Sequence, residues 1–176
     1  MGLAGDLIRT NIFGRNVKAG IRSLEAFLNR HPRIGLDTSL FIYHLEAHAR
    51  YAEFADFVFR TITKPRHSAV ASTLTMTELL VGPYRKADDQ RVNQYYALLT
   101  TYPNLEWVAP DLSIADLAAK LRADHNLRTP DAIVAATVAQ ARATGFITND
   151  PVFKRLGTFE TLHLDDLPGG QVGQNT

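Results

Sequence analysis

Short apolar segments alternate with helical segments along most of this chain, and this alternation constrains the fold more than any other feature. The sequence predicts strands at residues 33–36, 68–71, 105–108, 146–148 and 161–164. Between consecutive strands lie segments with apolar residues at helical spacing or with residues that favour helix starts. Strands that alternate with helices form a parallel sheet covered by helices on both faces. We therefore expect an α/β fold with three layers.

Polar residues stand where several of these helices are expected to begin. The predicted caps are Ser39, Ser72 or Thr73, Ser113 and Thr129, because their hydroxyls can accept hydrogen bonds from free backbone N–H groups. The helix after Thr129 is almost wholly apolar over residues 132–143, so we expect it to be buried and to end at Gly145.

The length of the chain, 176 residues, suits one domain with a sizeable core. We expect a helical extension at residues 1–32, a main domain at residues 33–167 and a frayed tail at residues 168–176. Within the extension, residues 17–30 carry apolar side chains at helical spacing, which predicts one amphipathic helix that packs on the domain.

Composition and charge exclude several classes of protein. Cysteine is absent, which excludes disulfides, thiolate metal sites and thiol nucleophiles. The net charge is +1, so contact with nucleic acid must rely on a local basic patch. No apolar run approaches the roughly 20 residues that span a bilayer, and polar residues interrupt the N-terminus. We expect a cytoplasmic protein without membrane contact.

Four carboxylates stand at positions that suggest a common site. Asp37 follows the first predicted strand and Asp150 follows the strand at 146–148, and ligands bind at the carboxyl ends of such strands. Asp131 begins the apolar helix, and Glu78 lies in the helix after the second strand. By their spacing, we expect both to share the apolar stripe of their helix, where an unpaired carboxylate is costly.

Each acid by itself also has a structural explanation. Asp37 and Asp150 can cap helices, Asp131 can complement a helix dipole, and Glu78 can reach solvent. The combination of all four favours one site. Converging carboxylates need a compensating cation, and oxygen ligands suit Mg²⁺ or Mn²⁺ better than zinc. Such a site is typical of phosphodiester hydrolysis.

Four segments resemble the signatures of PIN-domain nucleases, with the closest likeness to VapC-type toxins of bacterial toxin–antitoxin pairs. They are Leu36–Ser39, Thr77–Leu80, Leu127–Ala136 and Ile147–Asp150. The resemblance runs from about residue 33 to residue 164. It implies a three-layer α/β/α PIN-like fold with a mostly parallel sheet, to which this chain adds the N-terminal helix.

The resemblance also implies an activity and partners. The activity is cleavage of single-stranded RNA with Mg²⁺ or Mn²⁺ as cofactor. The partners are a second copy of the chain in a homodimer, and a small antitoxin whose C-terminal segment lies across the active-site groove. The 32 residues before the first strand depart from the family pattern. They pack as an extra helix, cover the groove that the antitoxin uses, or extend the dimer interface.

Carried over by position, the resemblance makes Asp37, Glu78, Asp131 and Asp150 the catalytic, metal-binding acids. Asp37 and Asp131 hold the metal directly, while Asp150 and Glu78 act through water or orient the nucleophile. The supporting polar residues are Thr38, Ser39, Thr148 and Asn149. Basic residues near the acids are candidate contacts of RNA phosphates, namely Arg122, Arg128, Lys154 and Arg155.

Two other functions remain open at this stage. A PIN-like domain can bind RNA or a protein without cleaving, although the presence of all four acids argues against it. A phosphatase of the haloacid dehalogenase type also begins with a strand that ends in Asp. That family needs a second Asp where this chain has Ser39, and its catalytic lysine has no counterpart except the isolated Lys120.

Overall fold

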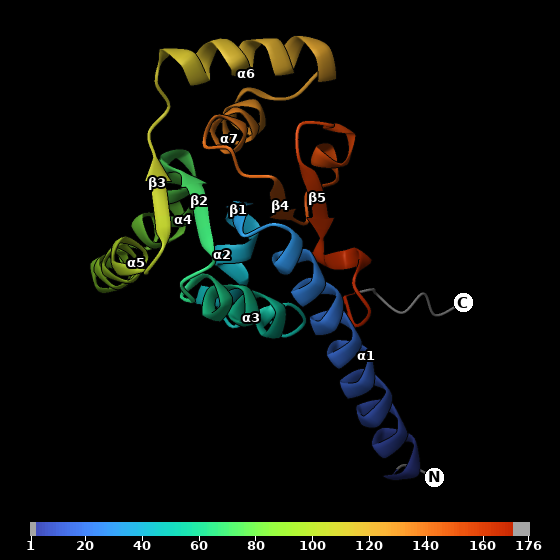
Figure 1. Cartoon of the computed structure of the whole chain (residues 1–176). Coiled ribbons are helices and arrows are strands. Elements are labelled where there is room, and N and C mark those ends of the chain that lie inside the picture. Colours follow the sequence, from blue (N-terminus) through green and yellow to red (C-terminus); the bar gives the residue numbers. More distant parts are fainter. Residues whose placement is uncertain (1–2, 171–176) are drawn as a thin grey trace.

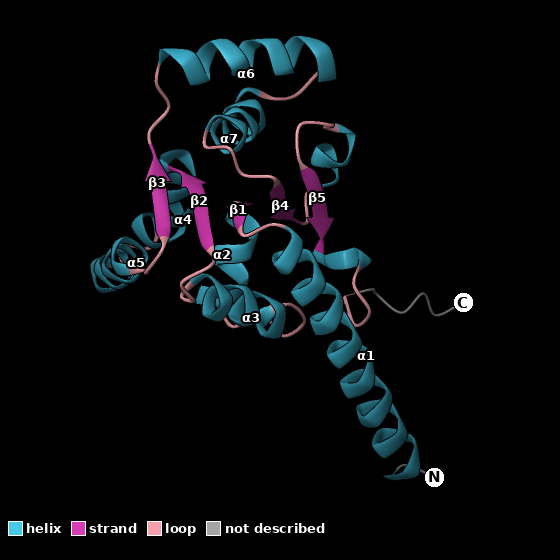
Figure 2. Cartoon of the chain, viewed as in Figure 1, coloured by secondary structure: helices cyan, strands magenta, loops and turns pink. Residues whose placement is uncertain are grey.

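The computed structural model describes the chain from residue 3 to residue 170, and its side chains from residue 16 on. Its sheet has five strands (Figure 2). They are β1 (Arg33–Leu36), β2 (Ser68–Ser72), β3 (Leu105–Val108), β4 (Gly145–Thr148) and β5 (Glu160–His163). All neighbouring strands pair in parallel, in the order β3-β2-β1-β4-β5. The prediction of a parallel α/β sheet is confirmed.

Seven α-helices in the described residues cover this sheet. They are α1 (Leu3–Arg30), α2 (Thr38–Leu45), α3 (Ala52–Ile62), α4 (Thr73–Arg85), α5 (Asp89–Thr101), α6 (Leu112–His125) and α7 (Thr129–Gln140). Two short 3₁₀ helices follow β4 and β5, η1 (Pro151–Arg155) and η2 (Leu164–Asp166). Figure 1 shows α6 and α7 on one face of the sheet and α1, α2 and α3 on the other, which are the expected three layers. No helix of the described chain is apolar and long enough to cross a membrane.

Two hydrophobic cores fill the spaces between the layers, because successive strand residues point to opposite faces. In β4, Ile147 packs into the core under α1, α2 and α3, while Phe146 packs into the core under α6 and α7. Gly35 of β1 allows α7 to approach the sheet, since a Cβ there would lie 2.5 Å from both methyl carbons of Val138. This close packing fixes α7, and with it the position of Asp131.

The N-terminal helix is longer than the predicted residues 17–30, because it begins at Leu3. Figure 1 shows its first half extending away from the sheet. Its second half buries Leu24 and Phe27 against the core. Residues 168–170 of the predicted tail pack beside this half, close to Val17 and Gly20, and the rest of the tail lies outside the described residues.

Ser72 caps α4 by accepting the Leu74 N–H at 3.3 Å, as predicted, but the other three predicted caps are wrong. Asp37, and not Ser39, occupies the capping position of α2. Asp111 caps α6 by accepting hydrogen bonds from the Ile114 N–H and the Ser113 hydroxyl, both at 2.8 Å. At α7 the capping position belongs to Arg128, whose side chain makes no capping bond. At α6 the carboxylate of Asp111, two residues before Ser113, competes for the cap, and the expectation from serine alone misses this competition.

The end of α7 also differs from the prediction. The helix stops at Gln140, and Arg142 then turns the chain with a positive φ of 57°. Gly145 is the first residue of β4 and does not end the helix. Its lack of a side chain is needed there, because a Cβ would lie 2.8 Å from ring atoms of Phe27 and His31.

Candidate active site

The strand order places the expected site between β1 and β4. From β1 the chain builds outward to β2 and β3, and then returns to add β4 on the other side of β1. Ligands in open parallel sheets bind at the carboxyl ends of strands where the order reverses in this way. Asp37 follows β1 at this edge, and its N–H donates to the Ile147 carbonyl at 3.1 Å. The backbone of Asp37 is therefore fixed to β4.

Two hydroxyl groups hold the carboxylate of Asp37. Ser39 Oγ donates to its Oδ2 at 2.8 Å, and Thr148 Oγ1 donates to the same oxygen at 2.7 Å. The carboxylate makes no capping hydrogen bond to α2, so the structural explanation of Asp37 as a helix cap is wrong. Both hydroxyls bind Oδ2, and no side-chain hydrogen bond of the described residues uses Oδ1.

Thr148 also connects Asp37 to Asp150. It is completely buried, and its Oγ1 accepts the Asp150 backbone N–H at 2.9 Å while donating to Asp37. One hydroxyl thus determines the positions of two acids on neighbouring strands. Asp150 Oδ1 accepts the Val152 N–H at 2.9 Å, so Asp150 is also the cap that its local sequence suggested. In the described chain no hydrogen bond uses Asp150 Oδ2.

Asp131 lies in the first turn of α7, at the same edge, since α7 runs antiparallel to the β4 strand that follows it. Its side chain is 14% exposed, and its Oδ2 accepts a hydrogen bond from Arg128 Nε at 3.2 Å. An acid in the first turn also complements the helix dipole. The predicted burial of Asp131 on the inner side of the helix therefore agrees with the structure.

Glu78 differs from the expectation because it is exposed on α4 and does not share a buried stripe. Tertiary contacts still bring it to the site. Its Oε2 accepts a short hydrogen bond from the hydroxyl of Thr38, the residue after Asp37. Thr75 of α4, which is buried, also lies 3.3 Å from the Thr38 hydroxyl. Thr75 is a supporting residue that the sequence analysis missed, and no local pattern marks it.

Asn149 makes hydrogen bonds that hold two elements together beside the site. Its Nδ2 donates to the Tyr43 hydroxyl at 3.1 Å, and its Oδ1 accepts the Asp165 N–H at 2.9 Å. The amide therefore joins α2 to η2, and both of its polar atoms are used there. This differs from the expected role of Asn149 as a support of the acids.

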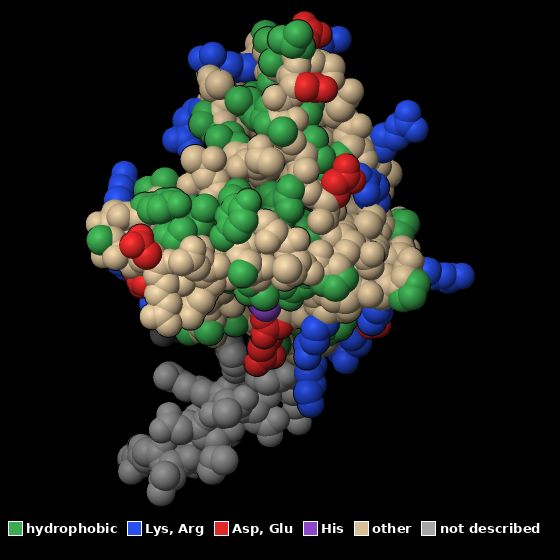
Figure 3. Space-filling model, turned by 90° about the vertical axis from the view of Figure 1, so that its left-hand side faces the viewer, with side chains coloured by type: hydrophobic (Ala, Val, Ile, Leu, Met, Phe, Trp, Pro, Cys, Tyr) green, Lys and Arg blue, Asp and Glu red, His purple; other side chains and the backbone are tan. Residues whose placement is uncertain are grey.

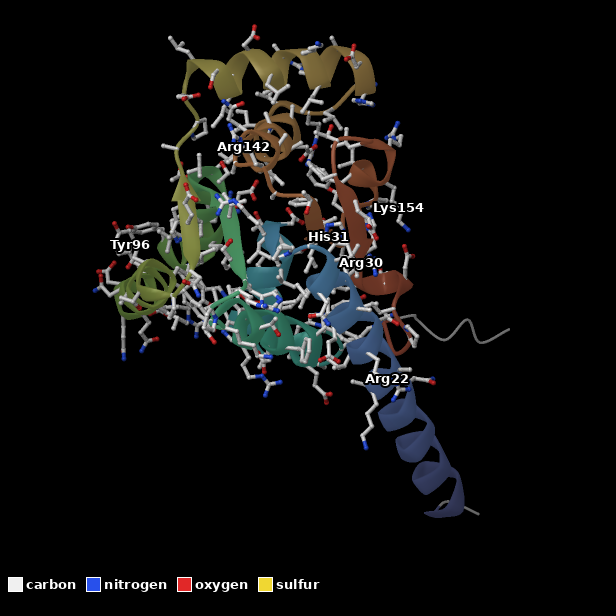
Figure 4. All side chains as sticks on the ribbon, viewed as in Figure 1. Arg22, Arg30, His31, Tyr96, Arg142 and Lys154 are labelled. Atoms are coloured by element: carbon white, nitrogen blue, oxygen red, sulfur yellow. The ribbon has the colours of Figure 1, made fainter. Side chains whose placement is uncertain are left out.

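The four basic candidates are all exposed, but only Arg128 contacts one of the acids. Lys154 Nζ binds both carboxylate oxygens of Asp166, at 3.0 and 2.8 Å, and Figure 4 shows it beside β5. Arg122 lies in the last turn of α6, and Arg155 lies in η1. Contact of these residues with RNA phosphates stays a prediction.

The environment of Asp37 disfavours its charged form. Burial raises its pKa above the ordinary value of 3.8, and the negative charge of Asp150 raises it further. Hydrogen bonds from Thr148 and Ser39 lower the pKa but do not outweigh burial. A buried carboxylate whose charge is opposed in this way gains from a nearby cation.

This raised pKa predicts how stability depends on pH without metal. The stability contribution of Asp37 is complete below its unfolded pKa, near 3.8, and is lost as the pH rises through the raised folded pKa. In EDTA, Asp37→Asn should therefore gain stability relative to wild type as the pH increases. Urea unfolding at several pH values measures this difference.

Asp111→Asn is the control for that experiment. Hydrogen bonds from Ile114 and Ser113 lower the pKa of Asp111, so its charged form stabilises the fold and this variant should lose stability relative to wild type as the pH rises. If the stability gain of Asp37→Asn over wild type stays constant or becomes smaller as the pH rises, the prediction is contradicted.

The donor set fits a hard divalent cation. The candidate ligands are carboxylate oxygens, which Mg²⁺ and Mn²⁺ prefer. No three acidic or histidine side chains within residues 16–170 already form a compact cage for a metal. Mg²⁺ is commonly bound by one or two carboxylates and keeps several waters. Asp37 after β1 and Asp131 at the start of α7 would supply such a pair, with Asp150 held next to Asp37 through Thr148.

Comparison with known proteins identifies the family of the chain. The sequence profile of the PIN domain matches residues 34–158, which is more than half of the chain. No curated protein matches this chain.

Several solved structures share the fold. VapBC2 from Rickettsia felis, bound to a DNA fragment from its promoter, aligns with a TM-score of 0.58 at 15% identity, over 74% of this chain and 98% of that chain. VapBC-1 from nontypeable Haemophilus influenzae aligns with a TM-score of 0.58 at 20% identity, over 74% and 97%. VapBC-5 from Mycobacterium tuberculosis aligns with a TM-score of 0.50 at 24% identity, over 75% and 98%. At these identities the likeness concerns the fold. With its profile match, its five-stranded parallel sheet and its acid-lined edge, the chain belongs to the PIN-domain family.

Proposed function

We propose that the protein is a metal-dependent endoribonuclease and the toxin of a cytoplasmic toxin–antitoxin pair. The observation that carries the proposal is the hydroxyl of Thr148, which joins Asp37 and Asp150 at the point where the strand order reverses. Asp131 and Glu78 approach the same edge from α7 and α4. Four acids at one edge of a PIN domain support hydrolysis of a phosphodiester.

The surroundings of each acid suggest its role in the reaction. Asp37 is held by Ser39 and Thr148, and Asp150 is held through its own N–H, so these two carboxylates are preorganised. We assign direct metal binding to Asp37 and Asp131, and water-mediated binding or orientation of the nucleophile to Asp150 and Glu78. When bound, Mg²⁺ or Mn²⁺ supplies a Lewis acid that activates water and neutralises charge on the phosphate.

An antitoxin and a second copy of the chain are the protein partners that we propose. The solved structures that share the fold are toxin–antitoxin complexes. Figure 3 views the protein from the side of α5 and shows hydrophobic side chains gathered on that surface. Exposed apolar residues of α4 and α5 include Val81, Tyr84, Tyr96 and Leu98. A groove of about 420 Å³ on α4 has Met76 and Leu80 among its lining residues. This surface supports a protein partner.

The proposal is tested by incubating the purified chain with several single-stranded RNAs. Cleavage is expected with Mg²⁺ or Mn²⁺, and it should stop in EDTA and return when the metal is restored, because the acids need the cation. Gel analysis of end-labelled RNA measures the products. Absence of metal-stimulated cleavage on all substrates would reject the nuclease function. RNA binding without cleavage would favour the alternative of a silent PIN-like domain.

A further inference from the structure

Arg128 lies beside the acids in an unusual position. Its Nε donates to Asp131 Oδ2 at 3.2 Å, although 81% of its side chain is exposed to solvent. It also occupies the capping position of α7 without making a capping bond. A positive charge is unfavourable there, because the N-terminal end of a helix carries a partial positive charge. Stabilisation of α7 therefore does not explain the position of Arg128.

The acids around Arg128 explain the position of its side chain better than stabilisation of α7 does. Asp131, which is bonded to the guanidinium, is the main cause that raises the pKa of Arg128, and the charges of Asp150 and Glu78 raise it further. The contact with Asp131 is direct, and the charges of Asp150 and Glu78 act on the guanidinium in the same direction. Within the described part of the chain, no other Lys or Arg side chain forms an ion pair with any of these four acids.

We propose that Arg128 is the internal counter-ion of the metal-free site and that a divalent cation displaces it from Asp131. This inference rests on the proposed function, since it assigns Asp131 to the metal. The lone pairs of Asp131 Oδ2 that accept the Arg128 N–H are among those that a cation would use. An ion pair whose cationic side chain is largely exposed to solvent is weak. The cation can therefore exchange with the guanidinium at little cost, and the released side chain stays tethered beside the bound phosphate.

The first measurement is the affinity for Mn²⁺ alone, without RNA. Electron paramagnetic resonance of free Mn²⁺ gives the dissociation constant for wild type, Arg128→Gln and Arg128→Lys. Removal of the competing charge should tighten Mn²⁺ binding by about three- to tenfold in Arg128→Gln. Arg128→Lys, which keeps the charge, should stay closer to wild type. Arg60→Gln is the control. Arg60 is exposed in the last turn of α3, so this substitution removes the same charge at a position away from the acids.

The second measurement follows the arginine itself. Titration with diamagnetic Mg²⁺ should shift the NMR signal of the Arg128 Nε–H, with the same midpoint as Mg²⁺ binding measured by calorimetry. A signal that does not move while Mg²⁺ binds would show that the ion pair persists, and this would overturn the inference.

The outcomes separate this inference from the proposed function. If Mn²⁺ binds to wild type but Arg128→Gln has the same affinity within twofold, or if Arg60→Gln gains as much, only the counter-ion role of Arg128 is rejected. If wild type binds neither Mn²⁺ nor Mg²⁺, the metal site fails, and the proposed function and this inference fail together. Tighter binding confined to Arg128→Gln, with a shifted Nε–H signal, supports the inference.

Discussion

Asp37→Asn is expected to reduce metal-dependent RNA cleavage by about 10²- to 10⁴-fold, the range typical for loss of a group that acts directly in a transition state. Asparagine has nearly the same shape, and its carbonyl oxygen can still accept hydrogen bonds from Ser39 and Thr148. It cannot supply negative charge to a cation. Single-turnover cleavage with excess enzyme measures the loss without interference from product release.

The control for this variant is Asp111→Asn, an equally conservative change at an exposed helix cap away from the acids. It should cleave RNA at the wild-type rate. Without metal, Asp37→Asn should also be at least as stable as wild type at neutral pH, because it removes a charge that burial opposes. A loss of cleavage in this folded variant would then be due to the loss of a catalytic group and not to unfolding. Retention of more than a tenth of wild-type activity would reject the assignment of Asp37.

Phe146→Ala is expected to lower the free energy of unfolding by about 3–5 kcal/mol. The ring is completely buried in β4 and contacts the rings of Phe153 and Phe159, with centroids at 4.9 and 5.1 Å. Its removal leaves a cavity between the sheet and the α7 layer. For a chain of this size the melting temperature should fall by roughly 6–20 °C. Urea denaturation and thermal melts measure both quantities.

Tyr96→Ala is the matched control for an aromatic side chain. Tyr96 lies on α5 with 55% of its surface exposed, and Figure 4 shows it on the outer side of the molecule. Its loss should change stability by less than about 0.5 kcal/mol. A similar, small effect of both substitutions would mean that the core under α7 is not packed as described. Phe146→Ala should also reduce cleavage, to the fraction of the protein that remains folded, because Phe146 lies two residues before Thr148 in β4.

The prediction of the strands from sequence succeeded because each strand is a short apolar run bounded by residues that break or start helices. The buried segments Ile34–Leu36 and Phe146–Thr148 can be read in this way without knowledge of their neighbours. Asp37 and Asp150 could be placed for the same reason, since they directly follow such runs. The helix caps were predicted less well. At α6, Asp111 and Ser113 both offer oxygen acceptors within three residues, and only the backbone geometry decides between them.

The sequence by itself determined that this chain forms a parallel α/β sheet, because the alternation of strands and helices leaves few other ways to bury its apolar residues. It also determined that two acids lie at the carboxyl edge. Only the tertiary structure decided how the acids are held. The hydroxyl of Thr148 joins two strands, and Glu78 reaches the site from an exposed position through Thr38. The bond between Thr148 and Asp37 connects residues 111 positions apart, and the bond between Thr38 and Glu78 connects residues 40 positions apart. Local patterns carry no information about them, because they depend on how whole layers pack.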